Sequence, residues 1–132
     1  MGFAVTGADF SEEALKRLRR FADRSGLNVN TIHVDLSQDD SLAGLGRYNN
    51  VIVNHYRLGP KQISSIHNNL WAGGILFING SAQNHAAHSS MRVVDLIVPG
   101  DLEALKHNFT ATSYYEYQDE RGSFVACVFK RK

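Results

Sequence analysis

The sequence has few of the features that cross-link a chain or anchor it in a membrane. It contains one cysteine, Cys127, which excludes a disulfide within the chain and is typical of a reducing compartment. No apolar run approaches the roughly 20 residues that span a bilayer, and the first ten residues do not have the pattern of a secretory signal. Charge of one sign is not in excess, because 14 Lys and Arg stand against 13 Asp and Glu. We therefore expect a cytoplasmic protein that has neither nucleic acid nor a membrane as partner.

The composition is that of an ordinary folded protein. The chain has 132 residues, of which 43% are hydrophobic and 20% are charged. A chain of this length buries a core without help from disulfides or metals. Because neither an internal repeat nor a linker interrupts the sequence, we expect a single domain over residues 1–132.

Strand-like runs alternate with helical patterns along most of the chain. One helix is expected between an N-cap at Ser11 and a stop at Gly26, a second from Pro60 to about residue 73, and a third near Asp101. The alternation predicts parallel strands joined by right-handed crossovers, and a closing antiparallel hairpin over residues 110–130 with its turn at 119–122. The expected parallel strands are residues 3–9, 29–36, 50–56 and 75–78.

Polar residues follow these strands at the points where ligands bind in open parallel sheets. Asp9 ends the first strand and Asp35 the second. An acidic residue at such a place can accept hydrogen bonds from ribose hydroxyls, and a second can accept one from the adenine amino group. For Asp9 the alternative is a structural role in the turn that enters the helix.

The order of these motifs resembles that of the class I S-adenosylmethionine-dependent methyltransferases, in particular their tellurite-resistance and thiopurine-like branch. The resemblance covers nearly the whole chain. It implies a Rossmann-like α/β sandwich with a mostly parallel sheet that ends in an antiparallel hairpin. The stretches that carry it are residues 5–15, 35–36, 50–58, 70–76 (Leu-Trp-Ala-Gly-Gly-Ile-Leu) and 99–102, followed by Tyr115 and Glu116 and a final strand ending in Lys-Arg-Lys.

The resemblance also implies roles for individual residues. S-adenosylmethionine would be the cofactor, with Asp9 on its ribose and Phe10 beside the adenine. Two further groups are implied. Asp35 and Leu36 would lie on the adenine, and Asn54, His55 and Tyr56 would face the methyl donor and a small-molecule acceptor, with Asn54 on the cofactor side and His55 and Tyr56 in catalysis. His55 is a candidate general base because a free imidazole titrates near neutral pH; the alternative is a partly buried histidine at a strand end.

The sequence departs from the family at one place. It contains no acidic-x-Gly-x-Gly-x-Gly loop, and it starts where the family's second strand starts, so we expect an N-terminally truncated fold. Three hypotheses follow: a methyltransferase-like protein degenerate for cofactor binding, an active enzyme completed by dimerisation or by upstream residues, and a non-catalytic homo-oligomeric interaction protein. The first is preferred for the chain as it stands.

Without that first strand, the strands at residues 3–9 and 50–56 are expected to expose unpaired backbone groups. Either they pair with each other or a second copy covers them, and a homodimer is the preferred prediction. Other side chains are given structural roles. We expect no metal site at His85 and His88, a core position for Cys127, and ordinary strand alternation at Tyr114, Tyr115 and Tyr117.

Overall fold

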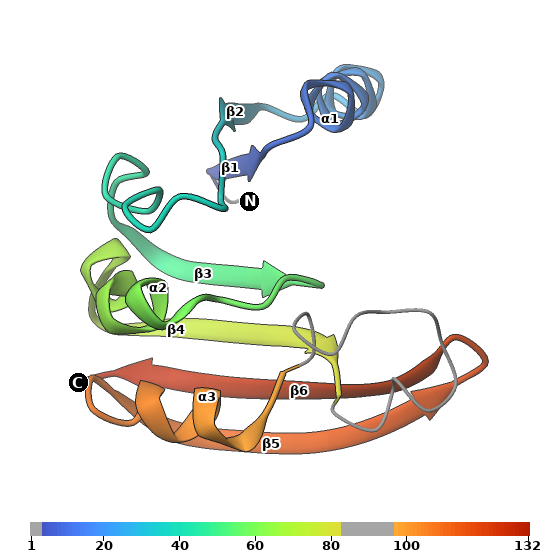
Figure 1. The fold of residues 1–132 in the computed structure, drawn as a ribbon. Coiled ribbons are helices and arrows are strands. Elements are labelled where there is room, and N and C mark those ends of the chain that lie inside the picture. The colour runs from blue at the N-terminus through green and yellow to red at the C-terminus, as the bar shows by residue number, and fades with distance from the viewer. Residues whose placement is uncertain (1–3, 83–96) are drawn as a thin grey trace. The chain divides into compact units, whose positions relative to one another are not determined.

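The computed structural model describes residues 4–82 and 97–132, in two compact units, Met1–Leu45 and Gly46–Lys132 (Figure 1). The described strands form two hydrogen-bonded sheets, one in each unit: β1–β2 and β3–β4–β6–β5. Among the described residues, none of the helices combines the length and the apolar character needed to cross a membrane.

The first unit is a β-α-β element. Strand β1 (Val5–Asp9) pairs in parallel with β2 (Val29–His33), and α1 (Glu12–Arg24) connects them. The Ser11 side chain caps α1 by accepting the Ala14 N–H at 3.1 Å. Helix and strand approach closely at Gly7, where a Cβ would lie 2.7 Å from Leu18 Cδ2, so only glycine fits there without a shift.

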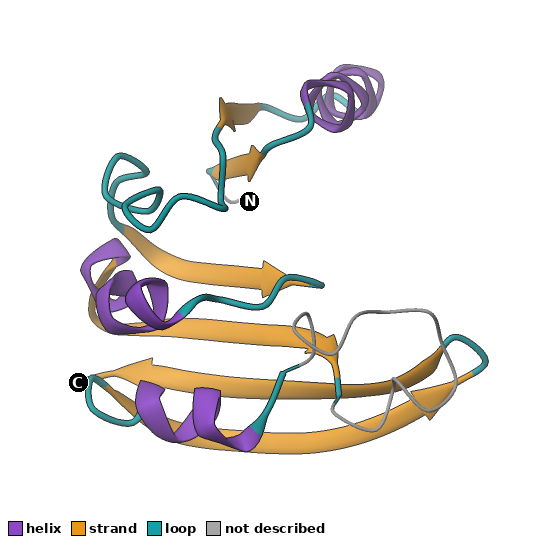
Figure 2. Cartoon of the chain, in the orientation of Figure 1, coloured by secondary structure: helices purple, strands orange, loops and turns teal. Residues whose placement is uncertain are grey.

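The second unit is a four-stranded sheet with two short helices on one side (Figure 2). Its strands are β3 (Tyr48–Asn54), β4 (Leu70–Ser81), β5 (Phe109–Asp119) and β6 (Gly122–Arg131). Strand β4 pairs in parallel with β3 and antiparallel with β6, which pairs antiparallel with β5. The helices are α2 (Pro60–Ser65), which runs into the 3₁₀ turn η1 (Ile66–Asn69), and α3 (Pro99–Leu105).

The two faces of this second sheet differ in burial. On the helix face, Leu76 and Ile78 of β4 lie opposite Phe129 and Cys127 of β6, and all four are buried. Ile63 of α2 and Leu105 of α3 pack over Ile78. On the other face, Ile52, Phe77 and Val128 form one row across β3, β4 and β6, in which Ile52 is 71% exposed.

The predicted parallel strands, the α1 helix and the antiparallel hairpin are confirmed. Three element boundaries were predicted wrongly. The second strand ends at His33 rather than Leu36, the third at Asn54 rather than Tyr56, and the helix from Pro60 ends at Ser65 rather than near residue 73. Strand β4 therefore begins at Leu70 instead of residue 75. Glycine explains the irregular start of β4: Gly73 has φ +79°, and a Cβ on Gly74 would lie 2.7 Å from the Asn49 carbonyl oxygen.

Within the described residues, β1 pairs with β2 in the first unit, and β3 pairs with β4 in the second. His85 and His88 lie outside the described residues, and so do most of residues 93–98, for which the sequence predicts a weak helical stretch.

We expect Leu76→Ala to lower the free energy of unfolding by about 2–5 kcal/mol, because Leu76 is fully buried and its removal leaves a cavity. Ile52→Ala is the matched control in the same sheet, and its exposed side chain should cost less than about 1 kcal/mol. Urea unfolding at low protein concentration measures both. Equal losses would contradict the burial pattern.

Candidate functional site

The first group of predicted site residues lies where β1 and β2 end. The parallel register sets Asp9 beside His33, so the loops that follow both strands start at the same edge of the sheet. Phe10 is 64% exposed, its ring lies 6.1 Å from the His33 ring, and His33 Nε2 lies 2.7 Å from the Phe10 carbonyl oxygen. Asp9 Oδ1 accepts the Ser11 N–H at 2.8 Å, which is the structural role that sequence reasoning left open for it. The same carboxylate is exposed, so it also remains accessible to a ligand.

Asp35 lies two residues beyond β2 in an exposed turn. Its Oδ1 accepts hydrogen bonds from the Ser37 hydroxyl at 2.6 Å and from the Ser37 N–H at 3.0 Å, and Oδ2 accepts one from the Gln38 amide at 3.3 Å. These donors, the Ser37 hydroxyl first, hold the pKa of Asp35 below its ordinary value. The carboxylate is therefore ionised and its orientation is set by the turn, and the next residue, Leu36, is half-buried.

The second group lies at the carboxyl ends of β3 and β4, in the other unit. Asn79 Nδ2 donates to Asn54 Oδ1 at 2.9 Å, and the Tyr117 hydroxyl donates to Asn79 Oδ1 at 2.7 Å. This chain of three side chains joins β3, β4 and β5. Asn54 therefore has its orientation fixed by neighbours that come from later in the chain.

Aromatic rings gather beside this hydrogen-bonded chain. Phe124 stacks on Tyr117 with ring centroids 5.3 Å apart, and His55 meets its edge at 5.9 Å. The Arg121 guanidinium lies 5.1 Å from the Phe124 ring centre. His55 adopts φ +55°, a left-handed conformation that disfavours a side chain and that is often found at functional sites.

Tyr56 is turned toward helix α2. Its hydroxyl donates to Gln62 Oε1 at 3.4 Å, and the residue lines a small space above Ile78 on the helix face. The structure thus brings Asn54 and His55 into one cluster and places the Tyr56 hydroxyl against α2.

Sequence reasoning missed four members of the cluster: Asn79, Tyr117, Phe124 and Arg121. Asn79 carried a signal, since it is the first polar residue after the apolar run 75–78, near the carboxyl end of β4. The other three lie on the hairpin, and only the register of β4, β6 and β5 brings them to Asn79.

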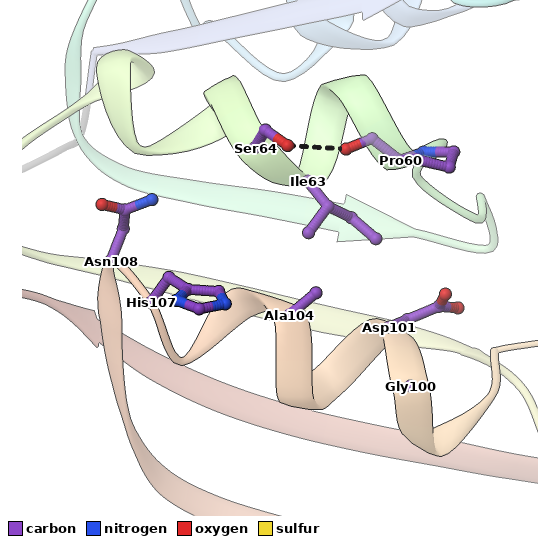
Figure 3. A pocket seen from close by; sticks show the side chains of 8 residues that line it. All are labelled: Pro60, Ile63, Ser64, Gly100, Asp101, Ala104, His107 and Asn108. Carbon is purple, nitrogen blue, oxygen red and sulfur yellow. Dashed lines mark hydrogen bonds between the residues drawn. The ribbon is translucent and has the colours of Figure 1, made fainter.

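A groove of about 570 Å³ lies between α2 and α3 (Figure 3). Asp101 at its rim forms a two-pronged ion pair with Arg57, with N–O distances of 2.9 and 3.1 Å. This groove is on the helix-covered side of the sheet, whereas the predicted site residues follow the strand ends. Its lining residues are Pro60, Ile63, Ser64, Gly100, Asp101, Ala104, His107 and Asn108.

Within residues 4–82 and 97–132, no three side chains of His, Cys, Asp or Glu gather as a metal site. Cys127 is buried, and burial raises the pKa of its thiol to about 11, which suits a core residue rather than a nucleophile.

Comparison with known proteins shows which fold this chain has. No family model matches the sequence, and no curated protein matches it. Among solved structures, the N-methyltransferase NodS from Bradyrhizobium japonicum WM9, solved with S-adenosyl-L-homocysteine, is similar with TM-score 0.76 and 14% identity over 97% of this chain. The chain has the class I methyltransferase fold.

Two further structures carry the same fold. TehB from Haemophilus influenzae has TM-score 0.76 and 16% identity over 99% of this chain, and an S-adenosylmethionine-dependent methyltransferase from Clostridium acetobutylicum ATCC 824 has TM-score 0.76 and 11% identity over 98%. The chain spans 66% of NodS, 51% of TehB and 75% of the Clostridium protein. At these identities the likeness establishes the methyltransferase fold alone.

We expect His55→Gly to be more stable than His55→Ala by about 1 kcal/mol, because glycine adopts φ +55° without strain and alanine does not. Both variants lose the ring contact with Phe124, so their difference isolates the backbone. Thermal or urea unfolding of the pair gives the answer. Equal stabilities would mean that His55 is not strained.

Proposed function

We propose that this chain is an S-adenosylmethionine-dependent methyltransferase homologue that, by itself, recognises the nucleoside end of the cofactor and holds the whole cofactor weakly. The proposal rests chiefly on the parallel register of β1 and β2, which sets Asp9 and Phe10 at the same edge as the turn that holds Asp35. An exposed carboxylate and an exposed ring suit a ribose and an adenine. The methyltransferase fold of the solved structures supports the same assignment.

The methionine end of the cofactor is charged and needs its own partners. In the family that the sequence resembles, a glycine-rich loop approaches it, and this sequence contains no such loop. Each missing hydrogen bond to a charged group costs about 1.5–3 kcal/mol, and each 1.4 kcal/mol is about tenfold in affinity. Losing several such contacts leaves a dissociation constant that is roughly millimolar or weaker.

Taken by itself, the cluster in the second unit offers side chains that suit a methyl acceptor. S-adenosylmethionine, when bound, would supply a methyl group that an in-line acceptor lone pair displaces as the carbon–sulfur bond breaks, with S-adenosylhomocysteine leaving and the acceptor losing a proton. Asn54, fixed by Asn79, would orient a polar acceptor, and His55 would take the proton. Tyr56 stays a candidate catalytic residue of the same small-molecule reaction, which we place in the cytoplasm.

We expect adenosine and S-adenosylhomocysteine to shift the same NMR signals, those of Asp9, Phe10 and Leu36, with dissociation constants that agree within about threefold. If only the nucleoside end is held, the methionine end adds nothing. Asp9→Ala should abolish the shifts. Asp23→Ala is the control, because it removes an exposed carboxylate of the same unit from α1.

Two other results of this titration would contradict weak binding of the nucleoside end. A low-micromolar dissociation constant for S-adenosylhomocysteine, lost in Asp9→Ala, would replace weak binding with the active enzyme whose pocket is completed by dimerisation or upstream residues. No shift with either compound would remove the nucleoside site. The non-catalytic homo-oligomeric protein would then lead, a candidate that the exposed Ile52 at the edge of the second sheet already favours.

A further inference from the structure

The hydrogen-bonded chain of Tyr117, Asn79 and Asn54 has a direction. The Tyr117 hydroxyl donates to Asn79 Oδ1 at 2.7 Å, and Asn79 Nδ2 donates to Asn54 Oδ1 at 2.9 Å. A phenol is a stronger donor than an amide, and an amide oxygen is a stronger acceptor than a phenol oxygen, so this order is favoured over its reverse. Each bond of the chain also polarises the next one, which strengthens the preference.

Backbone and ring contacts anchor the chain at both ends. Asn54 lies beside Asn79 in the parallel ladder of β3 and β4, and the His55 N–H donates to the Asn79 carbonyl oxygen at 2.7 Å. The Tyr117 ring stacks on the buried Phe124, with ring centroids 5.3 Å apart. Because neither end moves away, the Tyr117 hydroxyl determines which way round an amide two side chains away is turned.

The chain runs from a sheltered end to an exposed one. Tyr117 and Asn79 are half-buried, whereas Asn54 is exposed. The oxygen of the Asn54 amide is turned toward Asn79, so its Nδ2 is turned away, and among the residues that the structure describes Nδ2 has no hydrogen-bond partner. The Asn54 side chain therefore offers N–H donors, rather than its oxygen, to a ligand at the carboxyl end of β3.

We propose that Tyr117, acting through Asn79, is a positioning residue that makes the methyl-acceptor site selective for molecules with a hydrogen-bond-accepting atom. This inference rests on the proposed function, in which Asn54 orients the acceptor. The matching substrate carries an unprotonated oxygen or nitrogen, such as that of a carbonyl, a carboxylate or a pyridine-type ring, beside the atom that is methylated. A molecule that offers only an N–H or O–H group at that point leaves the Asn54 donors unsatisfied.

NMR of the side-chain amides tests the direction of the chain. In the unchanged protein, we expect the Asn79 Nδ2 protons to resonate downfield and to exchange slowly with solvent, because they are hydrogen-bonded. The Asn54 Nδ2 protons should resemble those of a free amide. Tyr117→Phe keeps the stacked ring and removes only the hydroxyl, so both amide orientations become populated and the Asn54 protons should move toward the hydrogen-bonded position. Tyr115→Phe is the control, because Tyr115 is an exposed tyrosine of the same strand.

Two small probes test the selectivity. Pyridine N-oxide only accepts hydrogen bonds, and pyrrole only donates them. We expect pyridine N-oxide to shift the Asn54 side-chain signals with a dissociation constant at least about threefold lower than that of pyrrole. Tyr117→Phe should bring the two constants within about twofold of each other, and Tyr115→Phe should keep their difference.

The proposal is wrong if the unchanged protein shows a free Asn79 amide and a hydrogen-bonded Asn54 amide. It is also wrong if the Tyr117→Phe and Tyr115→Phe variants behave alike, or if pyridine N-oxide does not bind more tightly than pyrrole, absence of binding included. Backbone amide spectra check that both variants fold. The measurements on the unchanged protein decide direction and selectivity even if a variant does not fold.

None of these measurements uses the cofactor. The nucleoside titration reads Asp9, Phe10 and Leu36 in the first unit, so it can fail while the direction and selectivity of the amide chain stand. The selectivity test can fail in turn while the nucleoside site stands.

Discussion

Strand β4 is the constraint on which the second unit depends. It pairs in parallel with β3 on one side and antiparallel with β6 on the other. Leu76 and Ile78 on one face of β4 form the buried layer under α2 and α3. Burial of such apolar side chains is the main contribution to the stability of the layer. Asn79 lies near the carboxyl end of the same strand, so the packing that stabilises the sheet also places the polar centre of the candidate site.

The hairpin completes that site from the far end of the sequence. Tyr117 and Phe124 face each other across β5 and β6, and the β4–β6 register brings Phe124 opposite Ser81 at the end of β4. Tyr117 can then reach Asn79, and Asn79 reaches Asn54. Because the Asn79 amide is held from two sides, by Asn54 and by Tyr117, the cluster is ordered without a ligand. At the rim of the cluster, the left-handed backbone conformation of His55 is energetically unfavourable, and the surrounding contacts stabilise it.

The proposed nucleoside site of the first unit is built differently. Asp9 and Asp35 each stabilise the turn that follows a strand, through Ser11 and through Ser37. A structural role in the turn and a binding role do not exclude each other, because a carboxylate has more acceptor positions than the turn occupies. The turn then fixes where the carboxylate points, and the proposed binding role would use the same side chain.

The alternation of apolar runs with capped helical patterns, read from the sequence alone, determined the parallel strands, α1 and the closing hairpin. It also located the residues at the strand ends, because the polar residue after an apolar run is a local signal. The alternation did not predict the element boundaries near Gly73 and Gly74, because a strand that starts at an irregular pairing has no periodic pattern. Only the tertiary structure decided that Asn79, Tyr117, Phe124 and Arg121 join Asn54 and His55, because strand register is a long-range property. Only it showed that Ile52 is exposed at a sheet edge, because the same apolar residue is buried or open according to how many neighbours its strand finds.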